Sequence, residues 1–434
     1  MALHYIFVFF FGVAFIVAIL RTLAYYFRDS VFDLTSWGWV LEKSNAHVFS
    51  DIIQSTFTMS TTSVTICIGL IGAMTLWLGI MRIGEDGGAI RILSKIVGPF
   101  FSKLFPELPK NHPASGSMLM NFSANMLGLD NAATPLGLKA MKQLQEVNPN
   151  KEEASNAQIM FLVLNTSGLT IVPVSVMAVR TAHGAANPAD VFLPILLATY
   201  FSTLAGLIAV SIYQKINLFD KTILSYLIGS SAVIGGILYF AIGLSPTQME
   251  LYSSFGGGFI LFSIITSFIY LGVKNKINIY DSFIDGAKDG FNVAIKIIPY
   301  LVGMLVGIGV FRASGAMDLL EHGLIVLGVS EDIVRSLPTA MMKPLSGSGA
   351  RGMMIEAIEY QKTLFPDNPS LGADTFVSRL VCTFQGSTET TFYTLAVYFG
   401  SVGVKKTRYA VTCGLIADAA GIIAAIFIAY LFFG

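Results

Sequence analysis

The stretch FVSRLVCTFQGSTETTFYTLAVYF, residues 376–399, decides the fold. Its two flanks are apolar, but its middle, Gln385–Thr391, holds six polar side chains and a glycine. The whole stretch is long enough to cross a bilayer, which takes about 20 residues. A polar middle survives at that depth only beside protein or a watery cavity, because hydrocarbon offers polar groups no partner. We therefore expect a transmembrane helix that is broken near the centre of the membrane.

The composition of the rest of the chain also indicates a membrane protein. Hydrophobic residues make up 54% of the 434 residues and charged residues only 12%, whereas roughly a quarter of a soluble domain is charged. This excludes a soluble enzyme. The formal net charge is zero and no long basic run occurs, which argues against binding to nucleic acid. The three cysteines and five histidines are scattered without metal-ligand spacing, so we expect neither a metal site nor disulfides.

Nine apolar stretches are long enough to be membrane crossings. The first is longer than a signal-peptide core of about 7–15 residues, so we expect it to be retained as a helix. The nine stretches are residues 3–27, 61–81, 159–179, 191–213, 222–244, 254–273, 294–311, 376–399 and 410–433.

Lysine and arginine in the short loops predict the orientation. The loops 214–221 and 274–288 contain lysines, whereas the loops 181–190 and 245–253 contain neither lysine nor arginine. Because positive charge collects on the cytoplasmic side, the first two loops are predicted inside and the last two outside. The amino terminus is then cytoplasmic and the carboxy terminus outside, in a bacterial inner membrane.

The chain resembles itself at an offset of about 230 residues, which indicates an internal repeat. Four segments of the first half match four segments of the second half in the same order: Leu78–Arg82 with Ile308–Arg312, Pro113–Ser117 with Pro344–Ser348, Asn165–Gly168 with Gln385–Thr388, and Ala205–Ile208 with Ala420–Ile423. The loop after the broken segment is predicted outside in the first half and inside in the second, so the two halves are antiparallel. Inverted repeats of this kind are typical of secondary transporters.

The repeat predicts four parts of the chain. Residues 1–57 form a first transmembrane helix and an external segment, residues 58–215 the first repeat, residues 216–280 two linking helices, and residues 281–434 the second repeat. Each repeat is expected to contain a re-entrant hairpin and a broken transmembrane helix. The fold class is therefore all-α and polytopic.

The hairpins are predicted from segments too polar for lipid and too apolar for a surface loop. In the first half we expect a hairpin over Lys95–Leu129 with its tip near Pro113–Ser117, followed by a cytoplasmic helix over Thr134–Glu146. An interfacial helix pair is the alternative. In the second half, Pro338–Tyr360 is expected to enter from the other side. Asn125, Ser346 and Ser348 are the candidate solute-binding residues of these segments.

The two breaks supply the other candidates. In the first half Asn165, Thr166 and Ser167 precede Gly168 and Pro173, and freed backbone groups there could bind a solute or ion. Hydrogen bonding between helices, with Pro173 as a simple kink, is the alternative. In the second half the candidates are Gln385, Ser387 and Thr388.

Two acids at membrane depth are candidates for coupling transport to Na⁺ or a proton. A carboxylate near the bilayer centre costs on the order of 3 kcal/mol, and such residues usually pair or line a pathway. Glu389 lies in the second break, and Asp418 lies between two alanines in the last helix. For Glu389 the alternative is a structural ion pair with Lys343 or Arg379, and for Asp418 it is a packing hydrogen bond.

Several of these motifs resemble a known family. The segments 124–141 and 164–167 are similar to spore maturation protein A, and the segments 343–350 and 386–403 are similar to spore maturation protein B, as if the two were fused. Both belong to the group with the nucleoside-recognition, or gate, domain, which includes concentrative nucleoside transporters and the ferrous iron transport protein B. The resemblance implies a transporter-like helical core but no particular substrate.

The leading hypothesis is therefore secondary transport or export of a small polar solute through a site between the breaks and hairpins. No cofactor is expected apart from a coupling Na⁺ or proton, and the expected partners are the lipid bilayer, the solute and a possible second copy of the chain. The alternative is a membrane-embedded assembly or structural partner in envelope or spore maturation. An intramembrane enzyme would need a nucleophile beside a base, and Ser387 near Glu389 is the only such pair, so we expect no catalytic residues.

Overall fold

The computed structural model describes residues 2–26, 47–109, 112–127 and 130–434, and these residues form helices and no strand. Residues 27–46, most of the predicted external segment, lie outside the described residues. The first repeat consists of α3 (Val48–Asp86), α4 (Ala89–Leu104), α5 (Pro113–Met126), α6 (Asp130–Glu146), α7 (Asn156–Ser167), α8 (Val174–Ala182) and α9 (Phe192–Gln214). The second repeat consists of α12 (Ile279–Ala313), α13 (Ala316–Val326), α14 (Glu331–Met342), α15 (Gly347–Thr363), η3 (Pro369–Asp374), α16 (Phe376–Ser387), α17 (Thr391–Ser401) and α18 (Ala410–Phe433).

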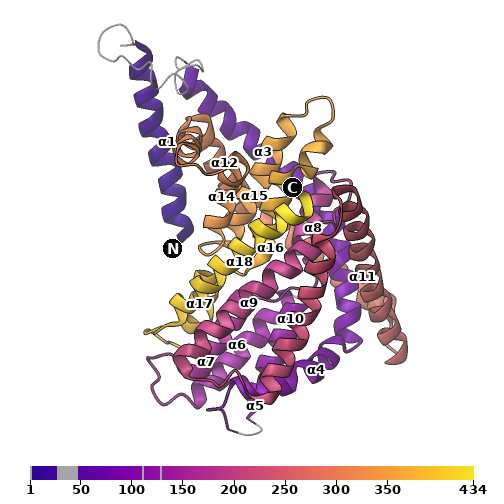
Figure 1. Cartoon of the computed structure of the whole chain (residues 1–434). Helices are drawn as coiled ribbons and strands as arrows, with labels where there is room; N and C mark the ends of the chain where they lie inside the picture. The colour runs from indigo at the N-terminus through magenta and orange to yellow at the C-terminus, as the bar shows by residue number, and fades with distance from the viewer. Residues whose placement is uncertain (1, 27–46, 110–111, 128–129) are drawn as a thin grey trace.

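All nine predicted crossings fall on helices. Among the described residues, six helices are long and apolar enough to span a membrane: α3, α9, α10 (Lys221–Ile242), α11 (Pro246–Lys274), α12 and α18. The first crossing falls on α1 (Ala2–Tyr26), whose apolar part runs over Phe7–Leu23. The remaining two crossings are each divided into a pair of shorter helices, α7 with α8 and α16 with α17. The chain is a multi-pass membrane protein, and α1 and α11 lie at opposite edges of it (Figure 1).

Equivalent helices of the two repeats pack against each other in antiparallel pairs. Along α3 and α12, Met59 approaches Gly309 and Met74 approaches Gly290, so residue numbers rise on one helix as they fall on the other. A Cβ built on Gly290 would lie 2.5 Å from Met74 O, so only glycine permits this crossing. Helices α9 and α18 also run side by side (Figure 1), and Ser202 donates to Ala417 O at 2.9 Å. The two repeats are therefore inverted, as predicted.

Local sequence explains where each broken helix starts and stops. Ser155 and Gln158 form a capping box that begins α7, and Gly168 ends it in the left-handed region, with φ 32°. Pro173 then precedes the first turn of α8. In the second repeat the Thr375 side chain caps α16, which ends where Thr388 adopts an extended backbone, with φ −147°. Each crossing is thus interrupted at the position that the sequence predicted.

The predicted tip of the first hairpin is wrong. Its arms are α5 and α6, which pack together, so the tip follows the end of α5 and does not lie at its start. The segment Pro113–Ser117 is instead the first turn of α5, where proline is favoured because its missing N–H has no helical partner. The match of this segment to Pro344–Ser348 therefore joined non-equivalent positions.

The other two hairpin predictions have different outcomes: one is corrected and one is confirmed. The helix expected separately over Thr134–Glu146 is the second arm, α6. In the second repeat the arms are α14 and α15, and the turn over residues 343–346 lies within the predicted hairpin.

Candidate functional site

The two broken helices cross at their breaks. Glu389 N donates to Thr166 O at 2.8 Å, so a backbone group freed by one break is satisfied by the other. On either side of this crossing α7 packs against α17, and α8 packs against α16. The irregular backbone of both repeats therefore meets inside the protein.

Each break is also joined to the hairpin of its own repeat by a backbone hydrogen bond. Ile171 N donates to Met126 O at 2.7 Å in the first repeat, and Phe392 N donates to Pro344 O at 3.0 Å in the second. The breaks and hairpin ends thus form one hydrogen-bonded unit with the same plan in both halves.

Side chains extend this pattern. Asn125 Nδ2 donates to Asn165 Oδ1 at 2.7 Å, which ties the first hairpin to the end of α7. Gln385 Nε2 donates to Gly347 O at 3.4 Å, which ties the end of α16 to the start of α15. These contacts bring together candidate residues that are far apart in the sequence.

A polar cavity of about 100 Å³ lies where these elements meet. That volume exceeds what a water molecule needs but is below the roughly 300 Å³ of a typical ligand pocket, so it suits a small solute group or several waters. Its polar and charged lining comes from both repeats: Asn125, Thr170, Ser175, Lys343, Arg351, Gln385 and Glu389.

Glu389 lies in the middle of a predicted crossing, but it is not buried. Its side chain is exposed, although Gln385, which also lines the cavity, is buried. Gly168 makes room for it, because a Cβ there would lie 3.0 Å from Glu389 Cγ. Arg379, one suggested structural partner of Glu389, instead pairs with Asp190.

None of the other candidate residues lines the cavity, and all of them are buried except Ser348, which is half-buried. The hydroxyls of Thr166, Ser167 and Ser387 donate to backbone carbonyls one turn earlier in their own helices. Ser346 Oγ accepts from Gly349 N and caps α15, with Ser348 Oγ at 3.3 Å. Candidate residues therefore divide into cavity-lining and framework positions.

Thr388 lies on the far side of the second break, against α18, which carries Asp418. Both are buried, with 2% and 1% of their surfaces exposed, and neither lines the cavity. The two acids predicted for coupling therefore have different surroundings, since Glu389 is exposed at the cavity and Asp418 is buried away from it.

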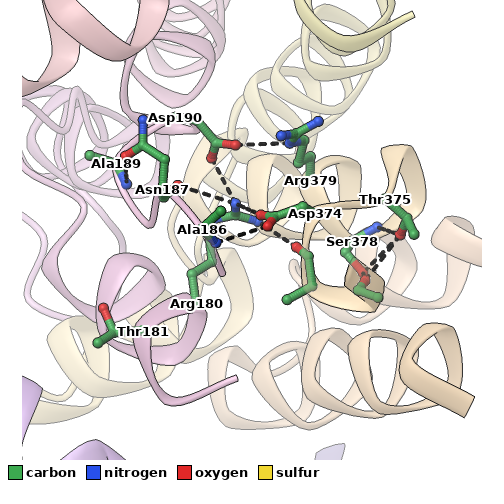
Figure 2. Close-up of polar contacts among 12 residues, drawn as sticks. Arg180, Thr181, Ala186, Asn187, Ala189, Asp190, Asp374, Thr375, Ser378 and Arg379 are labelled. Carbon is green, nitrogen blue, oxygen red and sulfur yellow. Dashed lines mark hydrogen bonds and ion pairs between the residues drawn. The ribbon is translucent and has the colours of Figure 1, made fainter. Parts of the chain in front are cut away.

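The paired broken helices are tied together at the end that is predicted to face outside. Figure 2 shows Arg180 of α8 between Asp190 and Asp374, at Nη2–Oδ1 distances of 2.9 and 2.7 Å. Arg379 Nε binds the other oxygen of Asp190 at 2.8 Å. Arg180 is fully buried, so this network closes that end with charges removed from water.

The opposite end is closed by backbone hydrogen bonds and by an exposed ion pair. Ala154 N donates to Lys406 O at 2.9 Å, and Lys405 Nζ pairs with Glu152 Oε1 at 2.7 Å. The side chains of this ion pair are 72% and 65% exposed. Because exposed ion pairs stabilise weakly, the Lys405–Glu152 pair contributes less to its end than the buried Arg180 network contributes to the other.

The sequence reasoning missed the Arg180 network and Arg351. Arg180 and Asp190 border the loop whose lack of lysine and arginine indicated only its side of the membrane, and the sequence predicted no role for Asp374. Arg351 follows the Ser346–Gly349 motif and lines the cavity. A charged residue at the end of an apolar stretch was the available signal, but one of its two carboxylate partners, Asp374, lies in the other repeat.

Replacing Asn125 by Leu is expected to lower the free energy of unfolding by about 1–3 kcal/mol, because the buried Asn165 loses its partner. Chemical or thermal unfolding of the purified protein measures this. The double variant N125L/N165L should be less destabilised than the sum of the two single variants. Additive losses would contradict a direct contact between the two side chains.

Comparison with known proteins agrees with this architecture. The family model described as gate, nucleoside recognition, matches residues 67–182 and 294–405, which together are just over half of the chain. Spore maturation protein A of Bacillus subtilis (strain 168) is 43% identical over 175 residues, covering 40% of this chain and 89% of that protein. Spore maturation protein B of the same organism is 43% identical over 175 residues, covering 39% of this chain and 91% of that protein. The resemblance to both proteins is confirmed, and with one match in each repeat the chain belongs to the nucleoside-recognition gate family.

Proposed function

We propose that this protein is a secondary transporter or exporter that moves a small polar solute through the cavity at the crossing of its two broken helices. The observation that carries the proposal is the meeting of both breaks, Glu389 N on Thr166 O, beside a polar cavity lined by both repeats. Opening either end of the paired helices would expose this cavity to one side of the membrane. The weaker Lys405 end would open more readily than the Arg180 end.

The cavity favours a solute with an anionic group, such as a carboxylate or phosphate. Lys343 and Arg351 supply two positive charges to its lining, against one negative charge from Glu389. The first residues of α8 and α15 also line it, and the amino end of a helix carries partial positive charge. Glu389, being exposed beside these groups, is the candidate for coupling solute movement to a proton or cation.

The loop charges support placement in an inner membrane with the amino terminus in the cytoplasm. Reporter fusions to the loops 214–221 and 245–253 would test this orientation directly.

Thermal unfolding of the purified protein with a panel of small solutes tests the function. We expect certain small carboxylates, or inorganic phosphate, to raise the melting temperature, and their neutral amides or esters to leave it unchanged, because a ligand that binds only the folded state stabilises that state. The solutes that raise the melting temperature should then cross the membrane of proteoliposomes that contain the protein. Binding and flux absent across the panel, together with a stable crosslinked complex with an envelope protein, would favour an assembly role instead.

A further inference from the structure

Four buried oxygen atoms on the far side of the second break lack hydrogen bonds. They are both carboxyl oxygens of Asp418 and the hydroxyl oxygens of Thr388 and Thr391. The three residues have 1%, 2% and 0% of their surfaces exposed. An unsatisfied buried polar atom is rare and costly, so four in one cluster call for a ligand.

The packing of α18 shows that this cluster is built into the fold. Gly414, Asp418 and Gly421 recur at helical spacing, and so share one face of α18. A Cβ on Gly414 would lie 2.7 Å from Thr391 Cγ2, and a Cβ on Gly421 would lie 2.6 Å from Thr388 Cγ2. The two glycines therefore let the break approach α18 on both sides of the carboxylate.

We propose that Asp418, Thr388 and Thr391 form a binding site for one monovalent cation, Na⁺, separate from the solute cavity. The hydroxyls of Thr388 and Thr391 lie close enough to act on the Asp418 carboxyl. None of the four oxygens nevertheless completes a hydrogen bond of good geometry. A proton on Asp418 would instead favour a close hydrogen bond to a hydroxyl. Oxygens that share a cation stand farther apart, about 3.4 Å at a right angle for a metal–oxygen distance of about 2.4 Å.

The charge around the cluster selects a monovalent ion. Asp418 is its only carboxylate, and no group of three or more His, Cys, Asp or Glu suited to a metal occurs in the described part of the chain. Lys343 and Glu389 are the other charged groups that act on Asp418, with opposite signs. The carboxyl end of α16, which carries partial negative charge, adds to the attraction, since Ser387 O lies 3.1 Å from a Cβ built on Gly421.

Binding there would order the solute cavity. Thr388 and Thr391 stand on either side of Glu389, whose backbone N–H joins the two breaks. A cation held by both threonines therefore fixes the segment that presents Gln385 and Glu389 to the cavity. This coupling rests on the proposed transport function, but the ion site itself does not.

The purified full-length protein, without any solute, tests the site. We expect NaCl to raise the melting temperature above that in choline chloride or KCl of the same ionic strength, and radioactive Na⁺ to be retained by the protein. Asp418→Asn should weaken Na⁺ binding at least tenfold, and Thr391→Val should weaken it severalfold. Thr383→Val is the matched control, because that buried threonine lies in α16 and already donates to Arg379 O at 2.8 Å.

Equal melting temperatures in NaCl, KCl and choline chloride would overturn the proposal. Na⁺ binding that is unchanged in Asp418→Asn would also overturn it. So would a melting temperature that depends on pH through Asp418 but not on Na⁺, which would indicate a proton site. If Asp418→Asn does not fold, Na⁺ binding by Thr391→Val is compared with Na⁺ binding by Thr383→Val. Equal binding by these two variants would then overturn the proposal. Na⁺ binding in a protein that binds no solute would leave this site standing while the proposed transport function fails.

Discussion

Replacement of Arg180 by Met should lower the free energy of unfolding by about 3–5 kcal/mol, the largest stability effect that we expect from one substitution in this protein. Arg180 is fully buried between Asp190 and Asp374, and it also donates to Ala373 O at 2.9 Å. Methionine fills a similar volume but leaves two carboxylates without their shared counter-ion. The loss can be measured by thermal or denaturant unfolding in detergent.

The exposed pair at the opposite end provides the comparison. Lys405→Met should cost less than about 1 kcal/mol, because both partners of that ion pair are mostly in water. Adding Asp374→Asn to Arg180→Met should restore part of the lost stability by removing one unpaired charge. Similar losses for the two single variants would contradict the assignment of Arg180 as the stronger closure.

Replacement of Glu389 by Gln should abolish coupled transport, with a loss of flux of at least tenfold, and leave the melting temperature nearly unchanged. The carboxylate lines the cavity and is exposed, so its loss removes a charge from the pathway without leaving a buried group unpaired. The backbone bond from Glu389 N to Thr166 O does not depend on the side chain.

Proteoliposomes loaded with the solute identified by thermal shift provide the measurement. Glu331→Gln is the control, since Glu331 is an exposed acid at the start of α14 that pairs with Arg335 outside the cavity. Unchanged flux in the Glu389 variant would remove this residue from the coupling mechanism.

The sequence was most informative where hydrocarbon restricts the choices. The nine predicted crossings follow from the length of each apolar stretch, and six of them fall on single helices long enough to span a membrane. The breaks follow from Gly168, Pro173 and Glu389, which a lipid-facing helix would not tolerate. The first hairpin could not be located by the same reasoning. A short match, Pro113–Ser117 with Pro344–Ser348, suggested equivalence, but proline starts a helix at one position and lies in a turn at the other.

The site was only partly predictable for a different reason. Asn125, Gln385 and Glu389 could be proposed because polar residues at depth need partners. The exposure of Glu389 and the burial of Asp418 could not be foreseen, since both depend on which face of each half-helix meets the other repeat. Side chains paired between the repeats carry no local signal of their partners.

The crossing of the two breaks also has a consequence for biosynthesis. Thr166 and Glu389 are 223 positions apart, so a ribosome that adds about 5–20 residues per second needs roughly 10–45 s to make the second after the first. During that interval α7 and α8 are already in the membrane without the backbone partners that the later half supplies. The nascent first half therefore depends on its own hairpin, the translocation machinery or water to shelter those groups until α16 and α17 arrive.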